Sequence, residues 1–179
     1  GIFSDVLLTV DFDRTLTAPD STVPARNIRA IEDFMAQGGS FTVNTGRSIP
    51  MCRRHILGKI PVNAPLLLYN GSAAYDQKTG ELSQCRLLNL DIRALVEDIQ
   101  GRFPELTLEV QGRDAHYIFY KNPAWESYSA YNDCAWAYCA PEKIPGPFMK
   151  FALYGDFRGN TVASMYQVEP WELESFDRA

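Results

Sequence analysis

The sequence predicts an α/β fold in which a parallel sheet forms a three-layer sandwich and an α+β domain follows it. Short continuous apolar runs alternate with segments of helical periodicity in the first part of the chain. Polar residues directly follow each of these runs. After residue 72 the alternation gives way to hairpin patterns. We therefore expect a core at residues 1–72 and an α+β domain at residues 73–179.

The predicted core consists of three strands and two helices. Residues 6–10 are apolar and β-branched, which is typical of a strand buried on both faces of a parallel sheet. Apolar residues at helical spacing predict a helix that ends at Gly38, because glycine commonly ends helices. Strands are predicted at 40–44 and 66–69, with a helix at 49–57 between them. The β-α-β-α-β order with right-handed crossovers gives a Rossmann-like core.

The second part of the chain shows strand patterns separated by turns, together with three helical patterns. This mixture favours an antiparallel sheet with helices. Strands are predicted at 73–75, 82–88, 106–110, 116–120, 148–154 and 168–176, and helices at 91–103, 123–138 and 160–166.

Composition excludes several classes of protein. The net charge is -5, from 17 Lys and Arg against 22 Asp and Glu, which disfavours nucleic acid as the partner. No segment approaches the roughly 18 apolar residues of a membrane span, and the first residues lack the pattern of a signal peptide. The four cysteines are irregularly spaced and do not form a disulfide framework. We therefore expect a cytoplasmic protein that binds neither membrane nor nucleic acid, and we leave its oligomeric state open.

Polar residues gather where the predicted strands end. Asp11 and Asp13 follow the first strand, Thr45 follows the second, and Asn70 follows the third. In open parallel sheets, ligands bind at the carboxyl ends of the strands. The sequence therefore predicts a binding site at this edge of the sheet.

The two carboxylates suit phosphoryl chemistry with Mg²⁺. Asp11 and Asp13 lie two residues apart on a short loop, and Mg²⁺ prefers oxygen ligands. One carboxylate can attack phosphorus and form an aspartyl-phosphate, while the other protonates the leaving oxygen and then activates water. The alternative is a solvated loop whose acidic residues cap a turn.

Two further segments can contribute to the same site. Thr45, Gly46 and Arg47 precede a predicted helix, where a hydroxyl and backbone N–H groups bind anions and Gly46 permits close approach. Arg47 can reach a substrate phosphate or carboxylate. The alternative is an ordinary helix cap by Thr45 with Arg47 on the surface. The Asn70 amide can bind substrate and Gly71 can act as a hinge, although Asn-Gly is also a common turn pair.

Three segments together resemble the haloacid dehalogenase superfamily: DFDRTLT at 11–17, NTGRS at 44–48 and YNGSAAYD at 69–76. Their order is similar to that of the Cof-type sugar-phosphatase-like branch, which has an α+β cap domain inserted after the third core strand. The resemblance implies Asp11 as nucleophile, Asp13 as acid and base, and Thr45 as a phosphate ligand. It also implies Mg²⁺ held by Asp11 and by the Asp13 backbone carbonyl, and a small phosphorylated metabolite as substrate. The family usually has glycine where this chain has Arg14.

Two motifs of the family are missing from the sequence, namely a lysine that steadies the phosphate and a GDxxND-type acidic motif. Lys150 and Asp156 lie too close together to replace them readily. Without the later core strands, residues 6–10 lie at a sheet edge, so we expect the chain to be part of a longer protein. The functional alternatives are a catalytically silent phosphate-binding protein and a related phosphomutase.

The remaining candidate residues have mainly structural interpretations. His55 and His116 lack a partner at a suggestive spacing, so we expect structural roles for both. Aromatic residues recur at near-helical spacing and indicate either a core face or a stacking surface for a sugar ring. These residues are Trp125, Tyr128, Tyr131 and Trp136.

Overall fold

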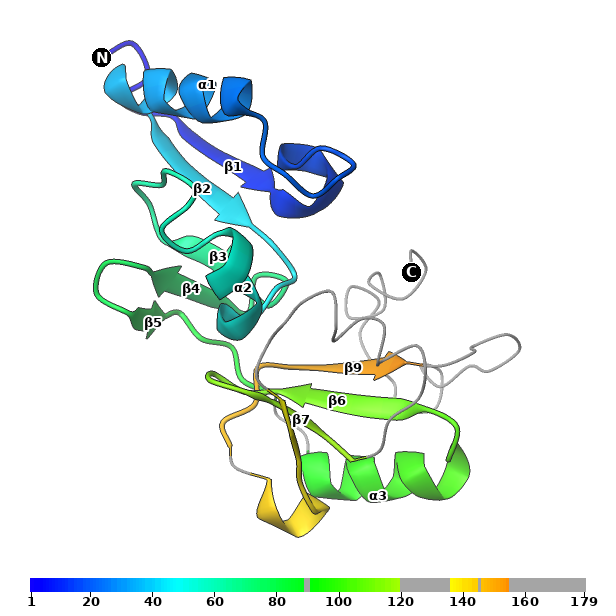
Figure 1. The fold of residues 1–179 in the computed structure, drawn as a ribbon. Helices are drawn as coiled ribbons and strands as arrows, with labels where there is room; N and C mark the ends of the chain where they lie inside the picture. The colour runs from blue at the N-terminus through cyan, green and yellow to red at the C-terminus, as the bar shows by residue number, and fades with distance from the viewer. Residues whose placement is uncertain (89–90, 120–135, 145, 155–179) are drawn as a thin grey trace.

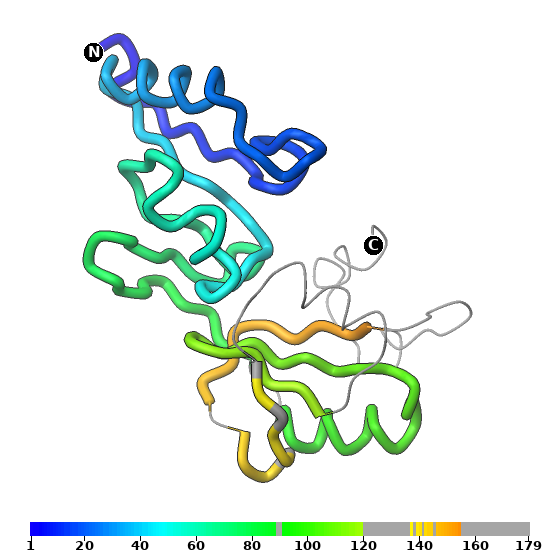
Figure 2. Tube along the Cα trace, in the orientation of Figure 1, coloured from blue at the N-terminus to red at the C-terminus, as the bar shows by residue number. Residues whose placement is uncertain are grey.

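A computed structural model describes residues 1–88, 91–119, 136–144 and 146–154. Within these residues the chain forms a sheet of five strands in the order β1-β2-β3-β4-β5 and a sheet of four strands in the order β8-β7-β6-β9. The two sheets follow one another along the chain and lie in separate halves of the molecule (Figures 1 and 2). We call them the first sheet and the second sheet.

The first sheet contains the predicted parallel core. β1 pairs with β2 and β2 with β3 in parallel, whereas β4 and β5 add an antiparallel hairpin. The predicted β-α-β-α-β order is therefore confirmed. The elements are β1 (Leu7–Asp11), a short irregular turn η1 (Phe12–Leu16), α1 (Ala25–Ala36), β2 (Ser40–Asn44), α2 (Ile49–His55), β3 (Leu66–Leu68), β4 (Ala73–Asp76) and β5 (Glu81–Ser83).

The hairpin shows where the first sheet ends along the chain. β4 and β5 lie at residues 73–83, and they pair with β3 rather than with the second sheet. The first sheet therefore extends past residue 72. The division of the chain into domains at 1–72 and 73–179 stays a prediction, because strand pairing alone does not define a folding unit.

β1 lies at the edge of the first sheet among the described residues. The relative exposures of Leu7 and Leu8 are 59% and 42%. The prediction of a strand buried on both faces is therefore wrong for the described part of the chain, where β1 is an edge strand that pairs with β2 alone. The expectation that this apolar strand lies at a sheet edge is confirmed.

The second sheet packs one face on α3. Its elements are α3 (Ile92–Arg102), β6 (Thr107–Gln111), β7 (His116–Ile118), β8 (Trp136–Tyr138), the 3₁₀ turn η2 (Pro141–Lys143) and β9 (Lys150–Tyr154). The Asp91 carboxylate caps α3 by accepting from two backbone N–H groups at 3.1 Å each. Leucine, valine and isoleucine side chains of α3, β6 and β9 form the apolar core between helix and sheet.

One predicted element differs from the structure. The helix expected at 123–138 does not include its last residues, because these form β8 and pair in parallel with β7. Cross-strand pairing outweighs local helical spacing here. The rest of that helix, the helix at 160–166 and the strand at 168–176 lie outside the described residues, as do Trp125, Tyr128 and Tyr131.

The described cysteines are free, and the described helices are too short or too polar to cross a membrane. Cys52, Cys85 and Cys139 are free thiols, whereas Cys134 lies outside the described residues. Burial raises the pKa of the Cys52 thiol to about 12. Within the described ranges, no helix has the length and apolar character needed to cross a membrane.

Candidate active site

A pocket of about 270 Å³ lies at the carboxyl ends of the parallel strands. Its lining residues are Asp11, Asn44, Thr45, Gly46 and Asn70. Asp11 ends β1 and stands opposite Asn44 at the end of β2 in the strand register. Four of the residues predicted for the site are therefore brought together, and Asn44 joins them.

The η1 turn buries its apolar residues and leaves Asp11 and Asp13 exposed to solvent. Phe12 and Leu16 are buried in the core of the first sheet, whereas Asp11 and Asp13 are exposed. The backbone N–H of Arg14 donates to the Thr17 hydroxyl at 3.0 Å and closes the turn. Burial of alternate residues thus directs both carboxylates toward solvent at the strand end.

Arg14 adopts the left-handed conformation, with φ 60°. A residue with a Cβ is disfavoured there and glycine is not. We expect Arg14→Gly to raise the free energy of unfolding by about 0.5–1 kcal/mol, measured by urea denaturation. Arg29→Gly, in the interior of α1, is the matched control and should lower it by about 1 kcal/mol. A loss of stability in Arg14→Gly would contradict this expectation.

Arg47 binds Asp13 rather than lying free on the surface. Its Nε and Nη2 donate to the two Asp13 carboxylate oxygens at 2.9 and 2.8 Å, so the pair is bidentate. The Arg47 side chain is 4% exposed and that of Asp13 is 45% exposed. The guanidinium also lies over the Phe12 ring, with its central carbon 5.2 Å from the ring centroid. The alternative of a surface Arg47 is therefore wrong, and the arginine orients Asp13.

The loop between β2 and α2, residues 45–48, is called the β2–α2 loop. The Ser48 side chain caps α2 by accepting from the Met51 N–H at 3.3 Å, so Thr45 is not the helix cap. The Thr45 hydroxyl instead accepts from the Arg47 N–H at 3.2 Å. Its oxygen is an acceptor in this bond, which leaves its hydrogen to be donated into the pocket that Thr45 lines.

The turn after β3 is joined to the β2–α2 loop by backbone hydrogen bonds. Tyr69 N–H donates to the Arg47 carbonyl at 3.1 Å and Asn70 N–H to the Thr45 carbonyl at 3.2 Å. Tyr69 and Asn70 have φ of 54° and 58°, a conformation that non-glycine residues hold only when their surroundings enforce it. These bonds place Asn70 in the pocket. Gly71 also has positive φ, at 85°, but is not a lining residue, and its role as a hinge stays a prediction.

Gly46 lies in a crowded place between Asn70 and the second sheet. A Cβ at this position would collide with Asn70 Oδ1 and lie 3.5 Å from Lys150 Nζ. We expect Gly46→Ala to displace Asn70 and to weaken phosphate binding about tenfold, since a hydrogen bond to a charged group would be lost. Isothermal titration with inorganic phosphate measures this. Gly101→Ala, where no atom lies within 4 Å, is the control and should leave affinity unchanged; equal effects of both changes would contradict the argument.

Lys150 connects the second sheet to this site. Its Nζ donates to the Gly46 carbonyl at 3.1 Å, although the two residues are 104 positions apart. Burial lowers the pKa of Lys150, and the nearby Glu109 carboxylate opposes that shift. No local spacing places Lys150 beside Gly46, because the two residues meet only in three dimensions. Asp156, its companion in the sequence analysis, lies outside the described residues.

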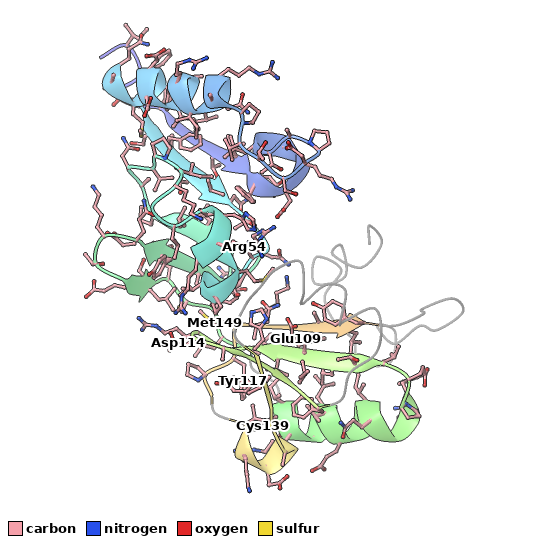
Figure 3. All side chains as sticks on the ribbon, viewed as in Figure 1. Arg54, Glu109, Asp114, Tyr117, Cys139 and Met149 are labelled. Carbon is pink, nitrogen blue, oxygen red and sulfur yellow. The ribbon has the colours of Figure 1, made fainter. Side chains whose placement is uncertain are left out.

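Sequence reasoning also missed a contact made by His116. Its Nε2 lies 2.7 Å from the Ser48 hydroxyl, and its Nδ1 lies 3.1 Å from a Glu109 carboxylate oxygen. His116, Glu109 and Ser48 are all buried (Figure 3 labels Glu109 on the second sheet). Ser48 and His116 are 68 positions apart, so no local spacing could have paired them.

The sequence matches one protein family over most of its length. A family model described as haloacid dehalogenase-like hydrolase matches residues 8–138. The chain therefore belongs to the haloacid dehalogenase-like hydrolases, and the resemblance of its three motifs is confirmed. A comparison with curated proteins found no match.

Solved structures share the fold. A haloacid dehalogenase-like hydrolase from Bacteroides thetaiotaomicron is 18% identical, with a TM-score of 0.72 over 84% of this chain and 58% of its own. A phosphatase of the haloalkanoate superfamily from the same organism is 16% identical, with a TM-score of 0.67 over 91% of this chain and 60% of its own. A subclass IIB sugar phosphatase of this superfamily is 14% identical, with a TM-score of 0.67 over 83% and 58%. The chain thus spans less than two thirds of the length of these three proteins.

Proposed function

We propose that this protein hydrolyses a phosphate monoester of a small metabolite, with Asp11 as the nucleophile. The observation that carries the proposal is that Asp11, Thr45 and Asn70 line one pocket at the strand ends. A carboxylate, a hydroxyl and an amide in one polar pocket can attack a phosphoryl group and donate hydrogen bonds to its oxygens. Membership of a hydrolase family supports the same reaction class.

In the first step, an Asp11 carboxylate oxygen attacks phosphorus and the bond from phosphorus to the ester oxygen breaks. Asp13, two residues along the chain, gives its proton to the departing oxygen, so that an alcohol leaves and an aspartyl-phosphate remains on Asp11. The Thr45 hydroxyl, the Asn70 amide and the backbone at Gly46 bind the phosphoryl oxygens. Gly46 permits this approach because it has no side chain.

In the second step, water attacks phosphorus and the bond to Asp11 breaks. Asp13 takes the proton of the water, which restores both aspartates and releases inorganic phosphate. Arg47 orients the Asp13 carboxylate for this role as base through two hydrogen bonds. A bidentate pair holds a carboxylate in one orientation, which a single bond does not.

The donor set fits Mg²⁺. Within the described residues no group of three or more His, Cys, Asp and Glu gathers around a metal position. Mg²⁺ does not require one, because it retains several waters and commonly takes one or two carboxylates together with substrate phosphate. The Asp11 carboxylate and the Asp13 backbone carbonyl would hold the ion, whereas the Asp13 side chain is bound to Arg47. When bound, Mg²⁺ offsets the repulsion between the anionic nucleophile and the phosphate.

The proposed substrate class follows from one of the similar structures. One similar structure is a sugar phosphatase, at 14% identity. We extend this to a small phosphorylated metabolite, with a sugar phosphate as the first class to screen. A cytoplasmic location belongs to the same proposal and rests on the composition.

The test is release of inorganic phosphate from an aryl phosphate, with Mg²⁺ and with a chelator. We expect phosphate release that requires Mg²⁺ and saturates with substrate. Phosphate binding without release would replace hydrolysis by the silent binding function. Transfer of the phosphoryl group to a sugar hydroxyl in preference to water would replace it by a phosphomutase.

A further inference from the structure

The second sheet has two chemically different faces. Leu108 and Val110 of β6 pack in the apolar core against α3. Glu109 and Gln111 alternate with them and therefore lie on the opposite face. The strand register places His116 on one side of Gln111 and Lys150 on the other. One face of the second sheet thus carries a row of polar residues.

This polar row is buried although it contains ionisable groups. Glu109, Gln111 and His116 are at most 1% exposed. Buried polar groups destabilise a fold unless they are hydrogen-bonded, so such a row needs partners. The Gln111 amide donates to Glu109 Oε1 at 2.7 Å, and the same oxygen lies 3.1 Å from His116 Nδ1. The carboxylate therefore fixes the Gln111 and His116 side chains together.

The row continues into the first half of the molecule through Ser48. The carboxylate makes His116 Nδ1 a donor, so in the neutral ring Nε2 accepts the Ser48 hydroxyl proton at 2.7 Å. Ser48 Oγ in turn accepts from the Met51 N–H. A continuous series of hydrogen bonds thus leads from Glu109, through His116, to the residue that caps α2.

Serine, histidine and a carboxylate in this order also compose a hydrolytic triad, but the burial excludes that role here. Ser48 is 0% exposed and its oxygen is bound to the Met51 N–H. A nucleophile has to reach a substrate atom, and Ser48 does not line the pocket. The series is therefore a connection between two parts of the molecule rather than a second catalytic centre.

The connection ends at the loop that forms the pocket. Ser48 follows Arg47, which holds Asp13, while Lys150 binds the carbonyl of Gly46. A third bond runs from the Tyr69 hydroxyl to the Gly112 carbonyl at 3.2 Å. Three hydrogen-bonded contacts therefore join the second sheet or its β6–β7 turn to the β2–α2 loop and to its neighbour Tyr69.

We propose that His116 is a positioning residue for the phosphate pocket, acting through Ser48 to hold the β2–α2 loop in its binding shape. The inference rests on the proposed function, since it assumes that phosphate binds where Thr45 and Gly46 line the pocket. His116 touches neither the pocket nor the substrate. His116 therefore acts on the reaction only through the loop. Because the loop binds phosphate, we expect the main effect to be on the affinity for phosphate.

The experiment compares His116→Leu, His116→Gln and Ser48→Ala, with Thr107→Val as the control. Leucine removes both hydrogen bonds at similar volume, whereas glutamine retains an acceptor for Ser48. Thr107 is equally buried on the same face of β6 but lies outside the connection. The readouts are the amide resonances of Gly46 and Arg47 in the free protein, the affinity for inorganic phosphate, and KM and kcat for an aryl phosphate.

We expect His116→Leu and Ser48→Ala each to weaken the affinity for inorganic phosphate and to raise KM about tenfold, because the loop binds phosphate. The effect on kcat should be smaller, because the Arg47 side chain keeps its two hydrogen bonds to Asp13. The double variant, His116→Leu with Ser48→Ala, should bind phosphate no more weakly than either single variant, since both changes break the same connection. His116→Gln should recover part of the affinity. The Gly46 and Arg47 resonances should move in these variants and remain in place in Thr107→Val.

Two results would overturn the inference. Unchanged phosphate affinity together with unchanged KM would mean that His116 does not shape the binding pocket, and unchanged Gly46 and Arg47 resonances would mean that it does not position the loop. If the native protein releases no phosphate and binds none, the proposed function fails. The resonances then decide the positioning role by themselves, because they are measured without substrate.

Discussion

Replacing Asp11 by asparagine should abolish phosphate release, with kcat at least about 10⁴-fold lower, because the amide is not a nucleophile for phosphorus. Asp11 is exposed at the end of β1, so the change should leave the fold intact. The measurement is phosphate release from an aryl phosphate, together with mass spectrometry of protein quenched in acid. Native protein should carry a covalent phosphoryl group and the variant should not.

Asp114→Asn provides the control for this experiment. Asp114 is 75% exposed and lies in the turn between β6 and β7, where its contact with Arg113 is also on the surface. The same change of carboxylate to amide should leave phosphate release within about twofold there, as surface ion pairs contribute little. Phosphorylation of Asp11→Asn, or full activity in it, would exclude Asp11 as the nucleophile.

Replacing Asp13 and replacing Arg47 should lower the stability of the fold by different amounts. Asp13→Asn leaves a guanidinium that is 4% exposed facing a neutral amide, whereas Arg47→Met leaves a carboxylate that is 45% exposed to water. Removing a partner of a buried charge lowers stability more than removing a partner of an exposed one. We expect Asp13→Asn to lower stability by more than Arg47→Met, whose effect should remain at about 1 kcal/mol. Urea denaturation of both variants measures the difference.

The losses of kcat in these variants should not follow the order of their losses of stability. Both changes should lower kcat by about 10²-fold or more, since one removes the acid and base and the other removes its orientation. Arg47→Lys is the informative comparison, because lysine keeps the charge but lacks the planar fork that binds a carboxylate at two points. Equal losses of stability in Asp13→Asn and Arg47→Met would contradict the inference drawn from their different exposures.

The sequence was sufficient where local rules determine structure. Apolar runs and helical spacing predicted the parallel strands and α1, because the side chains of these elements repeat with a fixed period. Asp11, Thr45, Gly46 and Asn70 could be predicted as neighbours because the carboxyl ends of parallel strands share one edge. The glycine that the family usually has at the position of Arg14 agrees with the φ of 60° found there.

The sequence was insufficient where a contact joins distant segments. Arg47 suggested a substrate ligand, yet its guanidinium binds Asp13, 34 positions earlier. Helical spacing suggested a helix up to residue 138, but pairing with β7 made the last three residues a strand. His116 suggested no partner because Ser48 and Glu109 reach it only in three dimensions. Periodicity reports which face a residue lies on, not what that face meets.

The hydrogen bond between Lys150 and Gly46 has a consequence for folding during synthesis on the ribosome. At about 5–20 residues per second, translation from Gly46 to Lys150 takes roughly 5–20 s, since the two are 104 positions apart. During this interval β1, β2 and β3 can pair, because all their residues have been made. The nascent chain can therefore form its first sheet early, whereas the pocket at the strand ends gains its contact with Lys150 only after β9 has emerged.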